Sequence, residues 1–323
     1  MSKENGKVKK ILGNQIAVVT LILAALFIFF SINAKGFFAV YNFKSILQQT
    51  AVVGIITVAQ AYVIITAGID LSQGAIIGLV TVVSAGLIVD NGQPVWLAII
   101  VGILVGTAIG AINGILVAFL GLPAFIATLG TKYVFEAIAL LMKGGNDIYN
   151  LPSQIAEFGR GTIGGWLPNL AIIMLIVAVV MHVVVHRTSF GRCVYACGSN
   201  LPAARFSGVK TKKVIFLVYL IAGFLCGVAG IVMMCRINAG IAVSGKGYEM
   251  NAVCGVVIGG GSLSGGKGSI LGAIVGAFIM TVLSSGLQIM GFSTYWQNLI
   301  TGIVLVIAVM IDTFRHMKNQ GVA

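Results

Sequence analysis

The stretch VWLAIIVGILVGTAIGAINGILVAF, residues 95–119, contains no charged side chain, and Thr107 and Asn113 are its strongly polar residues. A helix needs about 20 mostly apolar residues to cross the hydrocarbon core of a bilayer, so this stretch is long enough. Glycine recurs at every fourth position, at Gly102, Gly106, Gly110 and Gly114. These glycines share one helical face and allow a second helix to approach closely. We therefore expect a membrane-spanning helix here that packs tightly against another helix.

The whole chain resembles this stretch in composition. Of its 323 residues, 59% are hydrophobic and 9% are charged, whereas a soluble domain carries about 25% charged residues. So few polar side chains cannot cover the surface of a soluble protein, and a bilayer removes that need. We expect one all-α domain over residues 1–323, a polytopic membrane bundle of about ten transmembrane helices. The candidate spans are 15–33, 46–66, 73–89, 95–119, 124–142, 166–186, 214–236, 250–263, 268–290 and 296–312.

The distribution of basic residues predicts how this bundle is oriented. Ten spans place both termini on one side of the membrane. The tails and loops of that side hold thirteen Lys and Arg residues, and the loops of the opposite side hold five. Because the more basic side is normally the inner one, we expect cytoplasmic tails at 1–14 and 313–323 and a cytoplasmic loop at 187–213. This topology accounts for the net charge of +12 without a nucleic-acid partner.

Two glycine-rich breaks interrupt the apolar spans. Residues 68–74 read GIDLSQG, and residues 261–266 read GSLSGG. In both, glycine, Leu-Ser and a further glycine are followed by a new stretch of small apolar residues. Matching breaks in two halves of a membrane chain point to internal repeats and to a transport path. We therefore interpret these breaks as related elements of a transporter.

The loop 187–213 contains six basic residues and no acidic one. Ser199 or Asn200 can cap a helix here, and Pro202 is tolerated in its first turn. Gly208 can end that helix in the left-handed conformation. The pattern predicts a helix of about two turns, which is too short to be stable without a partner surface. The alternative is a loop that serves only to fix the membrane topology, but this alternative does not explain the two caps.

The segment Gly198–Gly208 fits the pattern Gly-x-Asn-x-x-Ala-Ala-x-x-Ser-Gly. This pattern resembles the cytoplasmic loop of binding-protein-dependent sugar permeases, in the ribose/arabinose/galactoside branch of ATP-binding-cassette importers. The similarity extends over roughly residues 37–312 and is greatest to ribose-type permeases. Further stretches that fit the same family are ILQQT at 46–50, GIDLS at 68–72, AFIATLG at 124–130, GYE at 247–249 and GGGSLSGGKG at 259–268.

This resemblance implies the partners of the chain. A second permease subunit, expected to be an identical copy, would complete the path, and cytoplasmic ATPase subunits would hydrolyse ATP with Mg²⁺. The chain itself would carry no cofactor and would not be an enzyme. An extracytoplasmic binding protein would deliver a monosaccharide, with a ribose-like pentose favoured and a hexose or nucleoside left open. The expected location is the bacterial cytoplasmic (inner) membrane.

The resemblance and the polar residues of the spans together give three sets of candidate site residues. The residues expected to couple to the ATPase are Gly198, Asn200, Ala203, Ala204, Ser207 and Gly208. The substrate-path candidates are Gln60, Asp70, Asn113, Lys132, Glu136 and Asn251. The candidate contacts with the binding protein are Lys143, Asp147, Glu157, Arg160 and Glu249.

Lys132 and Glu136 depart from the family pattern, which leads us to expect neutral residues in this span. They lie four residues apart on one helical face, so mutual pairing would limit the cost of burying two charges. The pair is either a polar patch on the substrate route or a structural contact between helices. Membrane-embedded charges would also suit an ion-coupled secondary transporter, which is the main alternative function.

Three other motifs give little evidence for a function. Residues 261–267 nearly match a phosphate-binding P-loop, but Gly268 occupies the position where Ser or Thr binds magnesium. His182, His186, Cys193 and Cys197 lack the tight spacing of zinc ligands, and we expect packing roles for them. No set of residues typical of a catalytic site is evident.

Overall fold

The computed structural model describes residues 15–319, and the expected tail at 1–14 lies outside the described residues. Eight helices of this part are long and apolar enough to cross a membrane. They are α2 (Gln15–Asn33), α3 (Val40–Ile65), α5 (Val95–Ala118), α6 (Ala124–Leu141), α8 (Asn169–Arg187), α11 (Thr211–Ile237), α13 (Ile270–Ile289) and α14 (Thr294–Asn319). The shorter elements are α4 (Gln73–Val89), α7 (Ser153–Arg160), α9 (Ser189–Ser199), α10 (Leu201–Phe206), α12 (Tyr248–Ile258), β1 (Thr162–Ile163) and β2 (Leu167–Pro168).

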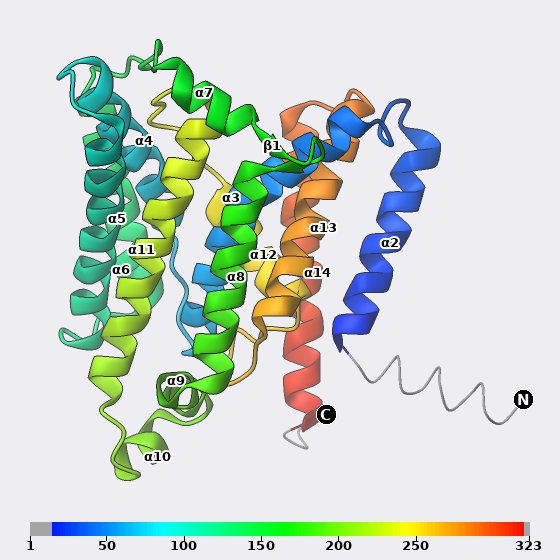
Figure 1. Cartoon of the computed structure of the whole chain (residues 1–323). Coiled ribbons are helices and arrows are strands. Elements are labelled where there is room, and N and C mark those ends of the chain that lie inside the picture. The colour runs from blue at the N-terminus through cyan, green and yellow to red at the C-terminus, as the bar shows by residue number, and fades with distance from the viewer. Residues whose placement is uncertain (1–14, 320–323) are drawn as a thin grey trace, which may run out of the picture.

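The helices form one bundle around α3, which is almost completely enclosed by its neighbours (Figure 1). Helices α8, α11, α12 and α13 all pack against it. By contrast, α2, α6 and α14 turn most of their apolar side chains outward. An outward apolar face is stable in lipid, whereas the polar backbone of every span must be satisfied inside its own helix. The fold is therefore a polytopic helical membrane bundle, as expected, with a two-stranded β1–β2 hairpin as a minor addition.

The glycine repeat identified in the sequence forms a close contact between two helices. It lies between α5 and α11, where a Cβ at Gly106 would be 2.7 Å from the Cα of Gly227. A Cβ at Gly110 would be 2.4 Å from the carbonyl oxygen of Tyr219. Two glycines four residues apart on α13 act likewise, because a Cβ at Gly272 or Gly276 would meet the backbone at the end of α12 or within it. The prediction that these glycines permit close helix approach is confirmed.

Two short helices, α4 and α12, start inside the bundle. After α3, residues 66–72 run back as an extended segment, visible in light blue in Figure 1, before α4 begins. The segment 238–247 comes between α11 and α12 and lies against α4. There a Cβ at Gly78 would touch the carbonyl oxygen of Ala242, and one at Gly245 would touch that of Gly74. The N-termini of the two short helices therefore meet in the interior, as in transporters with discontinuous helices.

The two ends of the bundle carry different elements. Helices α9 and α10 lie at the end where α2 begins and α14 finishes, and α7 lies at the other end (Figure 1). We call these the α10 end and the α7 end. The first and last helices thus begin and finish at the same end, as an even number of crossings requires.

The sequence-based spans agree with the helices to within seven residues at each boundary. Helix α14 continues to Asn319, so residues 313–319 of the expected tail are helical. Two further expectations differ from the structure. The expected span 250–263 is helix α12, whose 11 residues are too few to cross a bilayer alone. The loop 187–213 contains α9 as well as the expected short helix. The two glycine breaks also differ in position. Residues 68–74 lie inside the bundle, while residues 261–266 lie at the α10 end, so the internal repeat stays a prediction.

Candidate functional site

A cluster of buried polar side chains lies where α4 begins. Asp70 is 1% exposed, and its Oδ1 accepts hydrogen bonds from Ser72, from the N–H at 2.8 Å and from Oγ at 2.6 Å. This short turn holds the carboxylate beside the positive N-terminal end of α4, where a negative charge is stabilised. The amide of Gln60, oriented so that both its atoms find partners, bonds the carbonyl (3.2 Å) and N–H (3.3 Å) of Asp70. The extended segment is thereby fixed to α3.

Helices α5 and α6 complete this cluster. Asn113 donates to Ser72 Oγ at 2.8 Å and accepts from Thr131 at 2.7 Å, so a continuous chain of hydrogen bonds leads from Asp70 to α6. Thr128, one turn before Thr131, bonds the backbone of residues 69 and 71 at 3.1 Å each. Thr131 lies seven residues from the α10-end start of α6, about 10 Å along the helix. The cluster therefore occupies the half of the bundle nearer the α10 end.

An ion pair joins the cluster to the second short helix. The ammonium of Lys132 on α6 lies 2.5 Å from Oε1 of Glu249, which is in the first turn of α12. Glu249 is 2% exposed, and its other oxygen lies against Gly74 of α4. The expected pair between Lys132 and Glu136 is therefore wrong: the partner of Lys132 comes from another helix. Glu136 has no ion-pair partner among the described residues.

The cluster offers unused hydrogen-bond acceptors. Asp70 Oδ2, Gln73 Oε1 and Glu249 Oε2 are buried and find no hydrogen-bond partner within residues 15–319, and neither does the hydroxyl of Tyr219. A buried polar atom without a partner costs about 1–3 kcal/mol. Ligands that carry several hydroxyl groups donate to such atoms. The arrangement can thus accept hydrogen bonds from a polar, uncharged solute at the point where α4 and α12 begin.

Of the substrate-path candidates, four meet in this cluster: Gln60, Asp70, Asn113 and Lys132. Asn251 is half-buried on α12 and makes no side-chain hydrogen bond within the described chain, and Glu136 lies one turn further along α6. The sequence analysis did not single out Ser72, Gln73, Thr128, Thr131 and Tyr219. Except for Thr131 and Tyr219, these residues lie in or beside motifs that we had noted, so a polar residue next to a glycine break was the available signal.

The candidate contacts with a binding protein divide into two groups. Asp147, Glu157 and Arg160 are exposed, and Lys143 is half-buried and paired with Asp90. All four lie on α7 or in the segment that leads to it. Glu249 does not belong with them, because it is buried in the bundle; this expectation is corrected. Beside Asp147, the hydrogen bond that Tyr149 donates to it at 2.9 Å raises the pKa of the Tyr149 hydroxyl.

The short helix expected in the 187–213 loop is present as α10. The side chain of Asn200 accepts from the N–H of Ala203 at 2.9 Å, so Asn200 is the N-cap. Gly208 adopts φ +84° after the helix, as predicted for its end. Ala203, Phe206 and Ser207 are exposed, and Phe206 is 93% exposed. Ala204 instead is 6% exposed, on a helix that packs against α9 and α11 of its own chain, so its expected role as a docking surface is wrong.

Gly198 connects this loop to the core rather than to an outer surface. A Cβ at Gly198 would meet the carbonyl oxygen of Ile65, the last residue of α3. The same carbonyl accepts from the N–H of Gly266 at 2.9 Å. Tyr195 on α9 donates to the carbonyl of Gly268 at 2.8 Å, and partial burial raises the pKa of Tyr195. Helix α9 is thus attached to both the end of α3 and the 259–269 segment.

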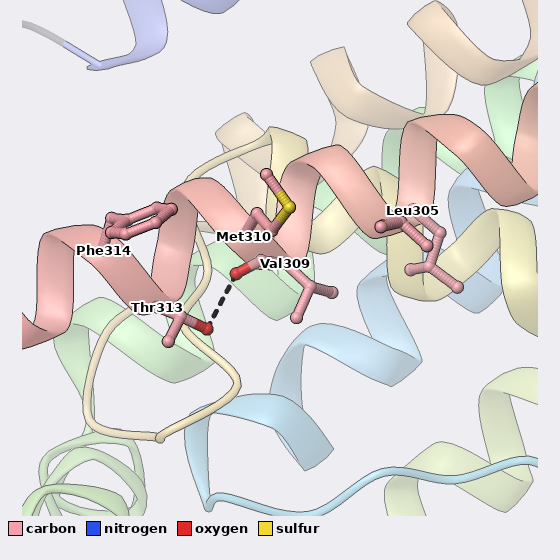
Figure 2. Close-up of a pocket in the computed structure, with 6 residues that line it drawn as sticks. Leu305, Val309, Met310, Thr313 and Phe314 are labelled. Carbon is pink, nitrogen blue, oxygen red and sulfur yellow. Dashed lines mark hydrogen bonds between the residues drawn. The ribbon is translucent and has the colours of Figure 1, made fainter.

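A hollow on α14 is unsuited to a sugar. It is lined by Leu305, Val306, Val309, Met310, Thr313 and Phe314, all from this one helix (Figure 2). The hydroxyl of Thr313 is its one polar side-chain group, and this group donates to the carbonyl of Val309 at 2.9 Å (Figure 2). The hollow therefore lies on the outer apolar surface of the bundle and offers no free polar group.

Comparison with known proteins gives a consistent result. Residues 42–309 match the family described as Branched-chain amino acid transport system / permease component. The Ribose import permease protein RbsC of Bacillus subtilis is 40% identical over 292 residues, which is 90% of each chain. The Fructose import permease protein FrcC of Rhizobium meliloti is 38% identical over 304 residues, 92% of this chain and 84% of that one.

The D-allose transport system permease protein AlsC of Escherichia coli is 36% identical over 285 residues, 88% of this chain and 87% of that one. No solved structure matches the chain.

Proposed function

Because the chain belongs to the family described as Branched-chain amino acid transport system / permease component, we propose that it is the permease subunit of an ATP-binding-cassette importer for a monosaccharide. The names of the relatives support a sugar, since they refer to ribose, fructose and allose. A ribose-like pentose is the favoured substrate, and a hexose or a nucleoside is the competing one. The buried cluster around Asp70 supports an uncharged polyhydroxylated solute, because its unused groups are mainly hydrogen-bond acceptors.

The assembly in which this subunit works has three kinds of protein component. Two copies of the chain form the path, and two cytoplasmic ATPase subunits bind α9 and α10 and hydrolyse ATP with Mg²⁺. A binding protein docks at the α7 end and delivers the sugar. Both termini, including the tails 1–14 and 313–323, lie in the cytoplasm of the cell, and the bundle lies in the inner membrane. The 13-to-5 distribution of basic residues supports this orientation.

The observation that carries this proposal is the connection between α10 and the polar cluster. α10 follows α9, α9 contacts the last residue of α3 at Gly198, and α3 leads directly into the segment that contains Asp70. A displacement of α10 by the ATPase is therefore applied within a few residues of the site. ATP binding would shift the bundle between two openings by favouring one of them, which is the requirement for ligand-driven change.

Purification of the complex followed by uptake measurements tests the proposal. The permease, co-expressed with its ATPase and binding protein, is reconstituted into vesicles, and uptake of labelled ribose, fructose and allose is measured. We expect ATP-dependent uptake of one of these sugars that requires the binding protein. Uptake that persists without ATPase and stops when an ion gradient is collapsed would instead identify an ion-coupled secondary transporter.

A further inference from the structure

The polar cluster contains charges that a neutral sugar does not require. Lys132 and Glu249 form an ion pair in the half of the bundle nearer the α10 end. A buried ion pair contributes little net stability, because desolvation offsets most of the attraction, yet removal of one partner is costly. Such a pair is better suited to holding two elements in one arrangement than to adding stability.

The elements that this pair holds are α6 and α12. Helix α6 packs chiefly on α4 and α5, so side chains rather than close helix packing connect it to α12. Glu249 lies in the first turn of α12, where the helix dipole favours a carboxylate, and Gly74 leaves room for this carboxylate against α4. The ion pair thereby fixes the start of α12 at the point where α4, α6 and α12 meet.

Glycines flank helix α12, so the chain can change direction at both of its ends. The backbone of α12 also contacts α13 directly, since a Cβ at Gly276 would meet the carbonyl oxygen of Gly255, so we expect α12 to move together with α13. Gly247 precedes it with φ +86° and open space around the position of a Cβ. Gly259, Gly260 and Gly261 follow it, and Gly260 has φ +98°. Glycine is the residue that most easily changes between such backbone conformations. An 11-residue helix between two glycine hinges can tilt without distorting its own hydrogen bonds.

The two side chains of the ion pair differ in how far they are enclosed by the protein. The Lys132 side chain is 19% exposed, whereas that of Glu249 is 2% exposed. The lysine is thus the less enclosed member of the pair and has more room to change its orientation. A second carboxylate lies within its reach, since Glu136 is one turn along the same helix face and has no ion-pair partner among the described residues. Asp70, the other carboxylate near Glu249, is already bonded to Ser72.

We propose that Lys132 is a two-position latch: it pairs with Glu249 when α12 closes the path toward the α10 end, and with Glu136 when α12 moves away. The closed position is the one in this structure. Movement of α12 separates Glu249 from α6, and the ammonium then turns to Glu136, so neither arrangement leaves the lysine unpaired. The role of the latch in transport rests on the proposed function, but the contact itself can be tested without it.

Chemical labelling of native cysteines tests the first position, in which Lys132 pairs with Glu249. Cys254 on α12 and Cys235 on α11 are both buried. In the purified full-length permease, the rate of N-ethylmaleimide labelling at each is followed by peptide mass spectrometry. We expect Glu249→Gln to accelerate labelling of Cys254 by about tenfold, because an unpaired buried lysine favours opening. Cys235 should keep its rate, which excludes general unfolding. Glu136→Gln should slow labelling of Cys254, because the displaced position then lacks a partner for Lys132, and should leave the rate at Cys235 unchanged.

Uptake measurements test the second position, in which Lys132 pairs with Glu136. In the reconstituted complex, Glu136→Gln should lower the rate of sugar uptake by about threefold or more, since Lys132 then has no partner when α12 is displaced. Membrane abundance of each variant is measured alongside.

Two results would overturn the proposal. If Glu249→Gln does not fold, Lys132→Met removes the same ion pair from its more exposed side, and the proposal requires that this variant accelerate Cys254 labelling. Unchanged Cys254 labelling in Lys132→Met, or in a folded Glu249→Gln, means that no latch exists. Wild-type uptake by Glu136→Gln means that Lys132 has no second position. Because labelling needs neither sugar nor ATPase, a positive labelling result with no sugar uptake would refute the proposed substrate alone.

Discussion

Ala67, directly after α3, adopts a left-handed backbone conformation with φ 62°. A residue with a Cβ pays about 1–2 kcal/mol in this conformation, whereas glycine does not. We therefore expect Ala67→Gly to increase the free energy of unfolding by about 0.5–1 kcal/mol, measured by thermal unfolding in detergent. Ala61→Gly, inside α3, is the matched control and should lower stability by about 1 kcal/mol. A lower midpoint for Ala67→Gly would show that the Cβ contact with the neighbouring Gly265 matters more than the backbone strain.

Asn113 holds together the hydrogen-bond chain between the extended segment and α6. Replacement by leucine leaves Ser72 and Thr131 without their partner, at a cost of about 1–3 kcal/mol. We expect Asn113→Leu to lower both thermal stability and sugar uptake. Asn251→Leu is the control, because this half-buried side chain makes no hydrogen bond within the described residues, and its stability should change by less than about 0.5 kcal/mol. Equal effects of the two substitutions would contradict the assigned role of Asn113.

At the scale of the element, two successive alanines lie on opposite faces of α10, one outer and one inner. Ala203 is exposed and Ala204 is buried. We expect Ala203→Trp to fold normally but to block the ATPase, so that uptake falls at least about tenfold at normal membrane abundance. Ala204→Trp should instead overpack the contact with α9 and α11 and reduce abundance, at a cost of about 1–3 kcal/mol. Co-purification of the ATPase with each variant provides the measurement.

The opposite pattern, with Ala203→Trp active and bound to the ATPase, would mean that this face of α10 does not contact the motor subunit. Such a result would leave the membrane fold untouched, because Ala203 makes no buried contact of its own.

Sequence reasoning located elements more reliably than it located their contacts. Helix boundaries such as Gln73–Val89 followed from hydropathy, and the N-cap at Asn200 from local chemistry, because both depend on residues close in the chain. The partner of Lys132 did not follow, since Glu249 is 117 residues away and only the meeting of α4 with α12 brings it near. The burial of Ala204 likewise depends on the packing of α10 against α9, and the basic sequence of the loop 187–213 did not indicate that it contains helix α9.

At the scale of the whole molecule, orientation in the membrane is open to a direct test. We expect a cysteine introduced by Ser2→Cys to resist an impermeant thiol reagent in intact cells and to react after permeabilisation. The physical reason is the excess of basic residues at the α10 end, which the positive-inside rule keeps in the cytoplasm. Asn146→Cys, in an exposed loop near α7, should react in intact cells and serves as the control. Reaction of the first cysteine in intact cells would invert the proposed topology.

The glycine contact between α5 and α11 makes these two helices a rigid lever. A Cβ at Gly106 or Gly110 would meet the backbone of α11, so the two helices are in direct backbone contact and we expect a displacement of one to be passed to the other. Four residues separate the end of α10 from the start of α11, which is 27 residues long, or about 40 Å. A push on α10 is therefore applied to one arm of this lever and reappears at its far end, beside α7. A displacement caused by the ATPase on one side of the membrane would therefore move the surface that contacts the binding protein on the other side, without a ligand passing between them.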